Sequence, residues 1–227
     1  MKKIVVLTGA GISAESGLKT FRDADGLWEG HDIYEVASPE GWHKNKALVL
    51  DFYNQRRKQL LNVNPNAAHV ALASLEPFYE VTIITQNVDD LHERAGSTNI
   101  IHLHGELLKS RSSIDENLIY PCNHDINLGD LCDKKSQLRP HIVWFGEMVP
   151  LIPTAIEITS KADIVMIIGT SMQVYPAASL LMYAKTSIPK YFIDPKPAVN
   201  KHEFQNLNVI AEKASIGVPL IIKQLIG

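Results

Sequence analysis

The chain has 227 residues, of which 45% are hydrophobic and 21% are charged, so it is long and apolar enough to bury an ordinary core. Its net charge of −3 argues against nucleic-acid partners, because there is no basic excess to displace counterions from phosphates. No apolar run approaches the roughly 20 residues of a membrane span, and two cysteines do not make a disulfide framework. We therefore expect a reducing, cytoplasmic setting and no membrane partner.

Four short apolar runs predict strands that are buried on both faces. In chain order they are KIVVLTG at 3–9, VTIITQN at 81–87, ADIVMIIGTS at 162–171 and KYFIDP at 190–195. Helical patterns lie between them, at 48–61, 66–75 and 176–185. This alternation predicts an α/β fold with a parallel sheet and helices on both faces, whose ligands bind beyond the carboxyl ends of the strands.

Two regions break the alternation. Residues 28–79 are mostly helical in pattern, and residues 106–139 are polar, irregular and hold both cysteines. We expect them to form a small lobe within a single domain of residues 1–227. The large lobe would then comprise approximately residues 1–27, 80–105 and 140–227.

The predicted helix at 48–61 carries a cation within its apolar stripe. The stripe is formed by Val49, Phe52, Tyr53 and Leu60. Arg56 lies in the middle of it, whereas Arg57 points further off, where a solvated charge is expected. A buried guanidinium needs a partner, which is either an internal carboxylate or a ligand.

The first strand runs into a glycine turn. Gly9 and Gly11 allow close backbone approach to a pyrophosphate. The next glycine is Gly17, so the spacing departs from GxGxxG, and no acidic residue closes a second strand about 20 residues later. An ordinary dehydrogenase is therefore a poor match, and a glycine turn without a ligand stays an alternative.

Polar side chains crowd the loop after the second strand, TQNVDDLHERAG. Gln86, Asn87 and Asp89 follow the strand, and an Asn and an Asp two residues apart can hold an amide or a ribose hydroxyl. In the alternative interpretation, Asp89 or Asp90 simply caps the helix that begins there.

The segment IIHLHGEL places His102 and His104 on opposite faces of a short extended stretch. His104, before Gly105 at a strand end, is the better candidate for a base near neutral pH, although a lone histidine is more often structural.

The last two strands end in further polar groups. Gly169, Thr170 and Ser171 offer backbone NH groups and hydroxyls, and Asp194 is placed to accept from ribose hydroxyls.

These motifs together resemble the sirtuins, a family of NAD-dependent protein-lysine deacylases. The matching stretches are GAGISAESGL, TFR, TQNVD, LHG, LRPHIVWFGE and GTSMQVYPA, in family order along nearly the whole chain. The resemblance implies a Rossmann-like domain, a small lobe of helices with a zinc-ribbon region, and a substrate cleft between them.

The resemblance also implies residue roles. His104 would be the catalytic base, with Asn87 and Asp89 as further catalytic residues. NAD would be bound by Gly9, Ala10, Gly11, Ser13, Thr20, Phe21, Arg22, Trp28, Gln86, Asn87, Asp89, Gly169, Thr170, Ser171, Asp194 and Ala214. The acyl-lysine protein or peptide would be bound by Tyr53, Arg56, Val143, Phe145, Gly146, Glu147 and Val174. Residues 143–147 would pair with the substrate backbone as an added strand.

The implied reaction consumes NAD instead of using it for hydride transfer. The acyl oxygen of the modified lysine attacks the ribose carbon that carries nicotinamide, and His104 then removes a proton from the ribose. The 2′-hydroxyl then attacks the resulting imidate, and water releases free lysine and O-acyl-ADP-ribose, with nicotinamide as the product of the first step.

The chain departs from the family at the zinc ribbon. Ser112 and Ser113 stand where the first Cys-x-x-Cys pair should begin, and Cys122, His124 and Cys132 remain. A structural zinc needs four ligands, so we expect no zinc, with an improvised site as the alternative. Asp194 also stands where many relatives carry asparagine.

Tyr53 and Arg56 match the Tyr-x-x-Arg pair of sirtuins that remove succinyl, malonyl and glutaryl groups. Three residues apart on a helix, they face one pocket and can bind a carboxylate. The alternative is an internal acidic partner, or an arginine stem that reaches water. Two other functions stay open, an ADP-ribosyltransferase and an NAD or ADP-ribose sensor.

Overall fold

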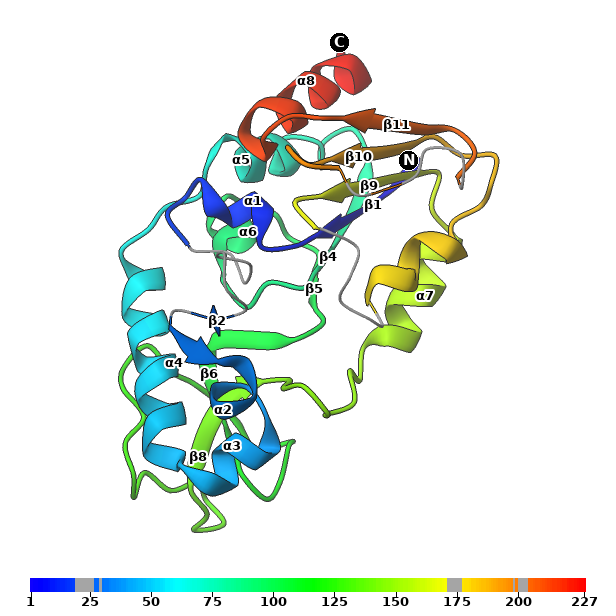
Figure 1. The fold of residues 1–227 in the computed structure, drawn as a ribbon. Coiled ribbons are helices and arrows are strands. Elements are labelled where there is room, and N and C mark those ends of the chain that lie inside the picture. Colours follow the sequence, from blue (N-terminus) through cyan, green and yellow to red (C-terminus); the bar gives the residue numbers. More distant parts are fainter. Residues whose placement is uncertain (19–26, 29, 171–176, 198, 200–203) are drawn as a thin grey trace.

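A computed structural model describes residues 1–18, 27–28, 30–170, 177–197, 199 and 204–227 (Figure 1). Within these ranges no helix is both long and apolar enough to cross a membrane. A six-stranded sheet in the order β11-β10-β9-β1-β4-β5, with every neighbouring pair parallel, forms the centre of the large lobe. Its strands are β1 (Lys3–Thr8), β4 (Glu80–Thr85), β5 (Ile100–His102), β9 (Ile164–Ile168), β10 (Lys190–Ile193) and β11 (Leu207–Ile210). The α/β fold and the four predicted strands are confirmed, whereas β11 was not predicted.

Helices cover both faces of this sheet, as the sequence predicts. Ile4 and Val6 of β1 lie in one core cluster with α5 (Ala67–Ala73) and α8 (Ala214–Ile226). The alternate residues Val5 and Leu7 lie in a second cluster with α7 (Ile152–Ser160) and the 3-10 helix η1 (Ala177–Tyr183). Both faces of β1 are therefore apolar, which explains its continuous hydrophobic run.

One predicted lobe boundary is wrong for α5. Ala68 and Leu72 of this helix, and Leu75 after it, are fully buried in the cluster on the sheet. The segment 66–79 thus packs as part of the large lobe, and the small-lobe segment 28–79 was drawn too long at its end. The helical pattern itself gives no information about which neighbour a helix covers.

The small lobe combines short helices with two antiparallel sheets. Its helices are α2 (Ile33–Val36), α3 (Pro39–Lys44) and α4 (Lys46–Leu61), and β2 (Leu27–Trp28) pairs with β3 (His31–Asp32). Residues 106–139, expected to be irregular, instead contribute to a sheet in the order β7-β6-β8. Its strands are β6 (Gly105–Ser112), β7 (Ile119–Pro121) and β8 (Leu138–Ile142). A third core cluster joins this sheet to α4.

Helix α4 is buried on two sides, which corrects the expectation for Arg57. The stripe of Val49, Phe52, Tyr53 and Leu60 is buried as predicted. Arg57, expected to be solvated, is only 1% exposed, and its Nε donates to the Leu107 carbonyl (3.1 Å) while Nη1 donates to Asn54 Oδ1 (2.8 Å). The sheet of residues 106–139 covers this second side of the helix. Arg56 is half-buried, with its Cζ 5.3 Å from the centre of the Phe52 ring.

Candidate active site

The floor of the candidate site is bare backbone at the carboxyl ends of β1 and β9. The Gly9 amide donates to the Ile168 carbonyl (3.0 Å), and the Gly11 amide donates to the Gly169 carbonyl (2.8 Å). A Cβ atom on Gly9 would lie 2.7 Å from Thr170 Cβ, and one on Gly11 would lie 2.7 Å from Gly169 Cα. Glycine is required because the two loops touch. The turn runs through Ala10 into α1 (Gly11–Ala14).

The loop after β4 is bonded directly to this glycine turn. The Asn87 side-chain amide donates to the Gly9 carbonyl (3.1 Å) and to Ser13 Oγ (3.2 Å), and the Gln86 amide donates to Thr170 Oγ1 (3.2 Å). The structure thus brings together residues from three of the predicted motifs, as expected where parallel strands end at one edge.

Asp89 is held by hydrogen bonds to two helices, and its contact with an amide or a ribose hydroxyl stays a prediction. Its Oδ2 accepts from Ser13 Oγ (2.9 Å), and its Oδ1 accepts from the Leu91 amide (3.2 Å) at the start of α6 (Leu91–Arg94). Burial raises the pKa of Asp89 to about 6, although these two hydrogen bonds oppose the change. This carboxylate is held inside the site and not in water, with 6% of its surface exposed.

His104 lies at the opening of β6 with one ring nitrogen fixed. Nδ1 is 3.0 Å from the Gln86 carbonyl, and because a carbonyl can only accept, Nδ1 carries the proton. Burial lowers the pKa of His104, while the bond to Gln86 opposes that shift. The ring is therefore neutral near pH 7, with Nε2 as its basic nitrogen, which is the state that a general base needs.

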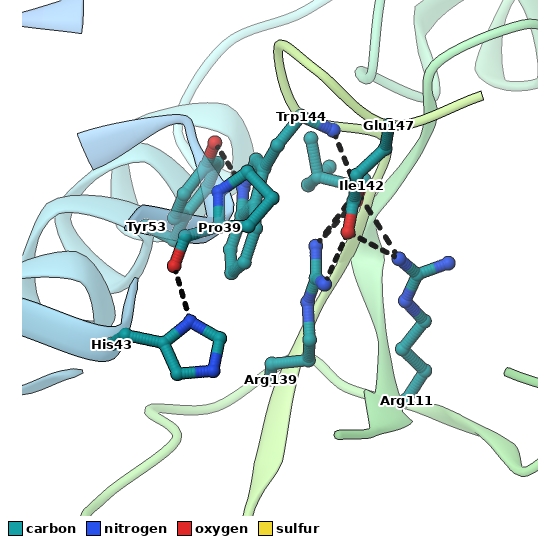
Figure 2. Close-up of polar contacts among 8 residues, drawn as sticks. All are labelled: Pro39, His43, Tyr53, Arg111, Arg139, Ile142, Trp144 and Glu147. Atoms are coloured by element: carbon teal, nitrogen blue, oxygen red, sulfur yellow. Dashed lines mark hydrogen bonds and ion pairs between the residues drawn. The ribbon is translucent and has the colours of Figure 1, made fainter. Parts of the chain in front are cut away.

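Tyr53 and Glu147, which were predicted to bind the substrate, belong to a hydrogen-bonded network in the small lobe (Figure 2). Glu147 accepts from Arg139 Nη1 (2.7 Å), Arg139 Nη2 (3.1 Å) and the Trp144 amide (2.8 Å), and Arg111 Nη2 lies 3.3 Å away. Arg139 Cζ is 3.2 Å from the centre of the Trp144 ring, whose Nε1 donates to Tyr53 Oη (2.9 Å). Tyr53 is 1% exposed, and burial raises its pKa. Trp144 and Arg139 were not singled out from the sequence, although both lie in the LRPHIVWFGE stretch.

Residues 143–147 connect His104 to the helices of the small lobe. The Val143 amide donates to the His104 carbonyl (2.9 Å), and the Phe145 amide donates to the Ala37 carbonyl (3.0 Å). Strand β8 ends at Ile142, and Gly146 adopts a φ of 89° in the turn that follows. The segment is a loop in this structure, and its pairing with a substrate stays a prediction.

Asp194 and Ala214, which were predicted to bind NAD, lie near β10 and α8. Asp194 Oδ1 accepts from the Lys196 amide (2.8 Å) just after β10, and Ala214 is buried at the start of α8. Ser215 joins α8 to α1 through two bonds to the Glu15 carboxylate (2.8 and 3.0 Å). Thr20, Phe21, Arg22, Ser171 and Val174, and the side chain of Trp28, lie outside the described residues.

The two cysteines bond within the small lobe. Cys122 Sγ donates to the His124 carbonyl (3.3 Å), and Cys132 Sγ lies 3.2 Å from Ser112 Oγ. The part of the chain that the structure describes has no group of three or more His, Cys, Asp or Glu side chains arranged to hold a metal ion. The expectation of a zinc-free protein stays a prediction.

The residues present fit a dinucleotide. Backbone without side chains forms the floor, so a pyrophosphate can approach closely, and Asn87, Asp89 and Asp194 carry amide and carboxylate groups of the kind that bind ribose hydroxyls. The fold and this edge of the sheet define a Rossmann-like protein of the nucleotide-binding class.

Comparisons with known proteins identify the family. The model of the Sir2 family matches residues 9–176, more than half of the chain. An NAD-dependent protein deacylase of Helicobacter pylori is 63% identical over 226 residues, covering 100% of this chain and 98% of that protein. The chain belongs to the Sir2 family, the sirtuins.

Solved structures agree with this assignment. A Sir2 homolog in complex with NAD is 38% identical, with a TM-score of 0.88, and the match covers 99% of this chain and 89% of that one. A Sir2 protein bound to an acetylated peptide is 28% identical, with a TM-score of 0.82, and the match covers 97% and 92%.

Proposed function

We propose that this chain is an NAD-dependent protein-lysine deacylase in which His104 is the general base. The single observation that carries the proposal is the bond from His104 Nδ1 to the Gln86 carbonyl, because it leaves Nε2 as the basic atom of a neutral ring. The name of the Helicobacter pylori relative and the NAD and acetyl-peptide complexes of other Sir2 proteins support the same activity.

Asn87 and Asp89 are proposed to hold the nicotinamide ribose and the reacting amide region. Both side chains are almost fully buried, at 8% and 6% exposed, and both bond to Ser13, while Asn87 also bonds to the Gly9 carbonyl. A prearranged polar group of this kind stabilises developing charge without having to reorganise during the reaction.

When bound, NAD supplies a ribose carbon with nicotinamide as its leaving group, which the acyl oxygen of the substrate displaces. His104 Nε2 accepts the proton from a ribose hydroxyl, and the Gln86 carbonyl stabilises the imidazolium that results. The deprotonated hydroxyl attacks the carbon of the imidate formed in the first step, and water completes the cleavage of its bond to the lysine nitrogen. The expected products are nicotinamide, unmodified lysine and O-acyl-ADP-ribose.

We propose further that the acyl pocket prefers acidic groups such as succinyl and malonyl. Tyr53 and Arg56 lie one turn apart on α4, where Tyr53 is buried and Arg56 is half-buried. Trp144 fixes the Tyr53 oxygen, and Phe52 packs against the Arg56 guanidinium. A guanidinium in this position is suited to a carboxylate at the end of an acyl chain.

Mass-spectrometric product analysis tests the proposal. The protein is incubated with NAD and peptides that carry acetyl, malonyl, succinyl or glutaryl lysine, with the unmodified peptide as control. A deacylase gives nicotinamide, O-acyl-ADP-ribose and unmodified lysine in equal amounts from an acylated peptide, and neither nicotinamide nor O-acyl-ADP-ribose with the control. Nicotinamide release with the unmodified peptide indicates a transferase, and an absence of release with all five peptides indicates a sensor.

A further inference from the structure

His102, two residues before His104, contacts the loop that follows β4, residues 86–90. Three consecutive carbonyls of this loop each accept a bond from the β5–β6 region. Gln86 accepts from His104 Nδ1, Asn87 faces His102 Nδ1 at 3.2 Å, and Val88 accepts from the Leu107 amide at 2.8 Å. The backbone of residues 86–88 is thus fixed from one side, and the Asn87 and Asp89 side chains extend from it.

His102 differs from His104 because both of its ring nitrogens donate. Nδ1 faces a carbonyl, and Nε2 lies 2.7 Å from Glu93 Oε1, which is a carboxylate. Neither partner can donate near neutral pH, so the ring is an imidazolium. Burial alone would lower the pKa of His102, but the bond and charge of Glu93 and the Asn87 carbonyl raise it overall.

Glu93 is itself held in place by its helix. Its neighbour Arg94 donates to the Val63 carbonyl and to Asn64 Oδ1 (3.1 Å), which anchors α6 to the segment after α4. The His102 side chain is 9% exposed and that of Glu93 is 41% exposed. The pair therefore joins a fixed helix to the carbonyl of Asn87.

We propose, on the basis of the function proposed above, that His102 is a positioning residue which, bridged to Glu93, fixes the Asn87 carbonyl and so orients the Asn87 and Asp89 side chains toward NAD. His102 itself touches neither the peptide nor the dinucleotide in this assignment. The charge of the ring also acts on Asp89, because a nearby cation favours the ionised carboxylate.

Three other titratable groups bear on this cation or on Asp89. Glu106 raises the pKa of His102 by its charge, as Glu93 does, but it is hydrogen-bonded to Lys109 (2.6 Å). The charge of His102 lowers the pKa of His92, and Asp90 raises the pKa of Asp89. Glu106 is therefore a matched control for Glu93, because its carboxylate acts on His102 by charge and has no hydrogen bond to the ring among the described contacts.

Hydrogen–deuterium exchange of the free protein tests the positioning directly. His102→Ala removes the donor to Asn87, and His102→Gln retains a side-chain N–H. In the Ala variant, the Gln86 and Asn87 amides should exchange at least about tenfold faster than in the wild type, and the Gln variant should recover part of the protection. Unchanged exchange in a folded Ala variant overturns the proposal. This measurement uses neither NAD nor peptide, so it is independent of the proposed function.

Kinetics with NAD and an acetyl peptide test the consequence. His102→Ala should lower kcat/KM for NAD about tenfold, because the loop that holds the ribose is misplaced. Glu93→Gln keeps a hydrogen-bonding partner for His102 but removes the carboxylate that stabilises its positive charge. A neutral His102 no longer lowers the pKa of Asp89. The acidic limb of the pH profile of kcat/KM should therefore move to higher pH. Glu106→Gln should move it much less. An equal shift in both variants, or none in Glu93→Gln, overturns the proposal, whereas an inactive wild type overturns only the proposed function.

Discussion

Buried polar side chains serve different purposes at the sheet edge and in the small lobe. At the sheet edge, His104 and Asn87 bond to backbone carbonyls, and in the proposed mechanism Nε2 of His104 is left to act as a base. In the small lobe, Glu147 is neutralised by Arg139 and Arg111 within the fold. Burial of a charge therefore does not identify a site residue.

The largest effect that tests this contrast is expected at His104. His104→Ala should lower peptide-dependent nicotinamide release by roughly 10²–10⁴-fold, because the general base is lost. The melting temperature should stay close to that of the wild type, since the lost bond to Gln86 is a single neutral one. Near-normal turnover by the folded variant would remove His104 from the mechanism.

A substitution in the small-lobe network around Glu147 should lower the melting temperature more than it lowers the catalytic rate. Glu147→Gln removes the charge that compensates Arg139 and Arg111, at a cost of about 3 kcal/mol for breaking a largely buried ion pair. At this chain length the melting temperature should fall by roughly 10 °C. Thermal unfolding measures this, with Glu157→Gln as control, because that carboxylate pairs with Lys161 in solvent. Equal melting temperatures for both variants would contradict a structural role for Glu147.

Adjacent arginines on α4 sharpen the comparison further. Arg56→Met should lower kcat/KM on succinyl peptide by roughly ten- to a hundredfold, because a charge-assisted hydrogen bond is lost. Activity on acetyl peptide should change little. Arg57→Met should instead alter the melting temperature and affect both peptides equally, since Arg57 is buried and bonds to Asn54 and Leu107 within the fold.

Steady-state kinetics on both peptides separate these outcomes. If Arg56→Met lowers both activities equally, Arg56 is structural, and the preference for acidic acyl groups fails while the deacylase activity stands.

The sequence predicted the large lobe because its central strands are apolar on both faces. β1, β4, β9 and β10 are continuous hydrophobic runs, and the rule that ligands bind at their carboxyl ends led to Gln86, Asn87 and Asp89 as candidates, whereas His104 was chosen as a histidine before a glycine at a strand end. β11 escaped notice because LNVI is short and only partly buried at the edge of the sheet. Hydrophobic patterns reveal strands that are buried on both faces, but they do not reveal a partly exposed strand at the edge of a sheet.

What the sequence could not provide were contacts that depend on distant segments. Arg57 was expected in solvent because a helical pattern shows only one apolar stripe, whereas its partner Leu107 comes from a sheet 50 residues later. The bond from His102 to the Asn87 carbonyl is equally invisible, since it depends on how β5 aligns with β4. Local sequence patterns predict helices and strands, whereas the hydrogen-bond partners of Arg57 and His102 depend on how distant segments pack together.

The smallest expected effect concerns metal in the small lobe. Removing divalent ions with a chelator should leave the melting temperature unchanged, because the thiols of Cys122 and Cys132 bond to His124 and Ser112, and apolar packing against α4 holds the sheet of residues 106–139. Elemental analysis of the purified protein should find no stoichiometric zinc. About one zinc per chain, with a melting temperature that falls on chelation, would show that Cys122, His124 and Cys132 rearrange into a site. The small lobe would then depend on a ligand for its stability, and its contrast with the sheet edge would be lost.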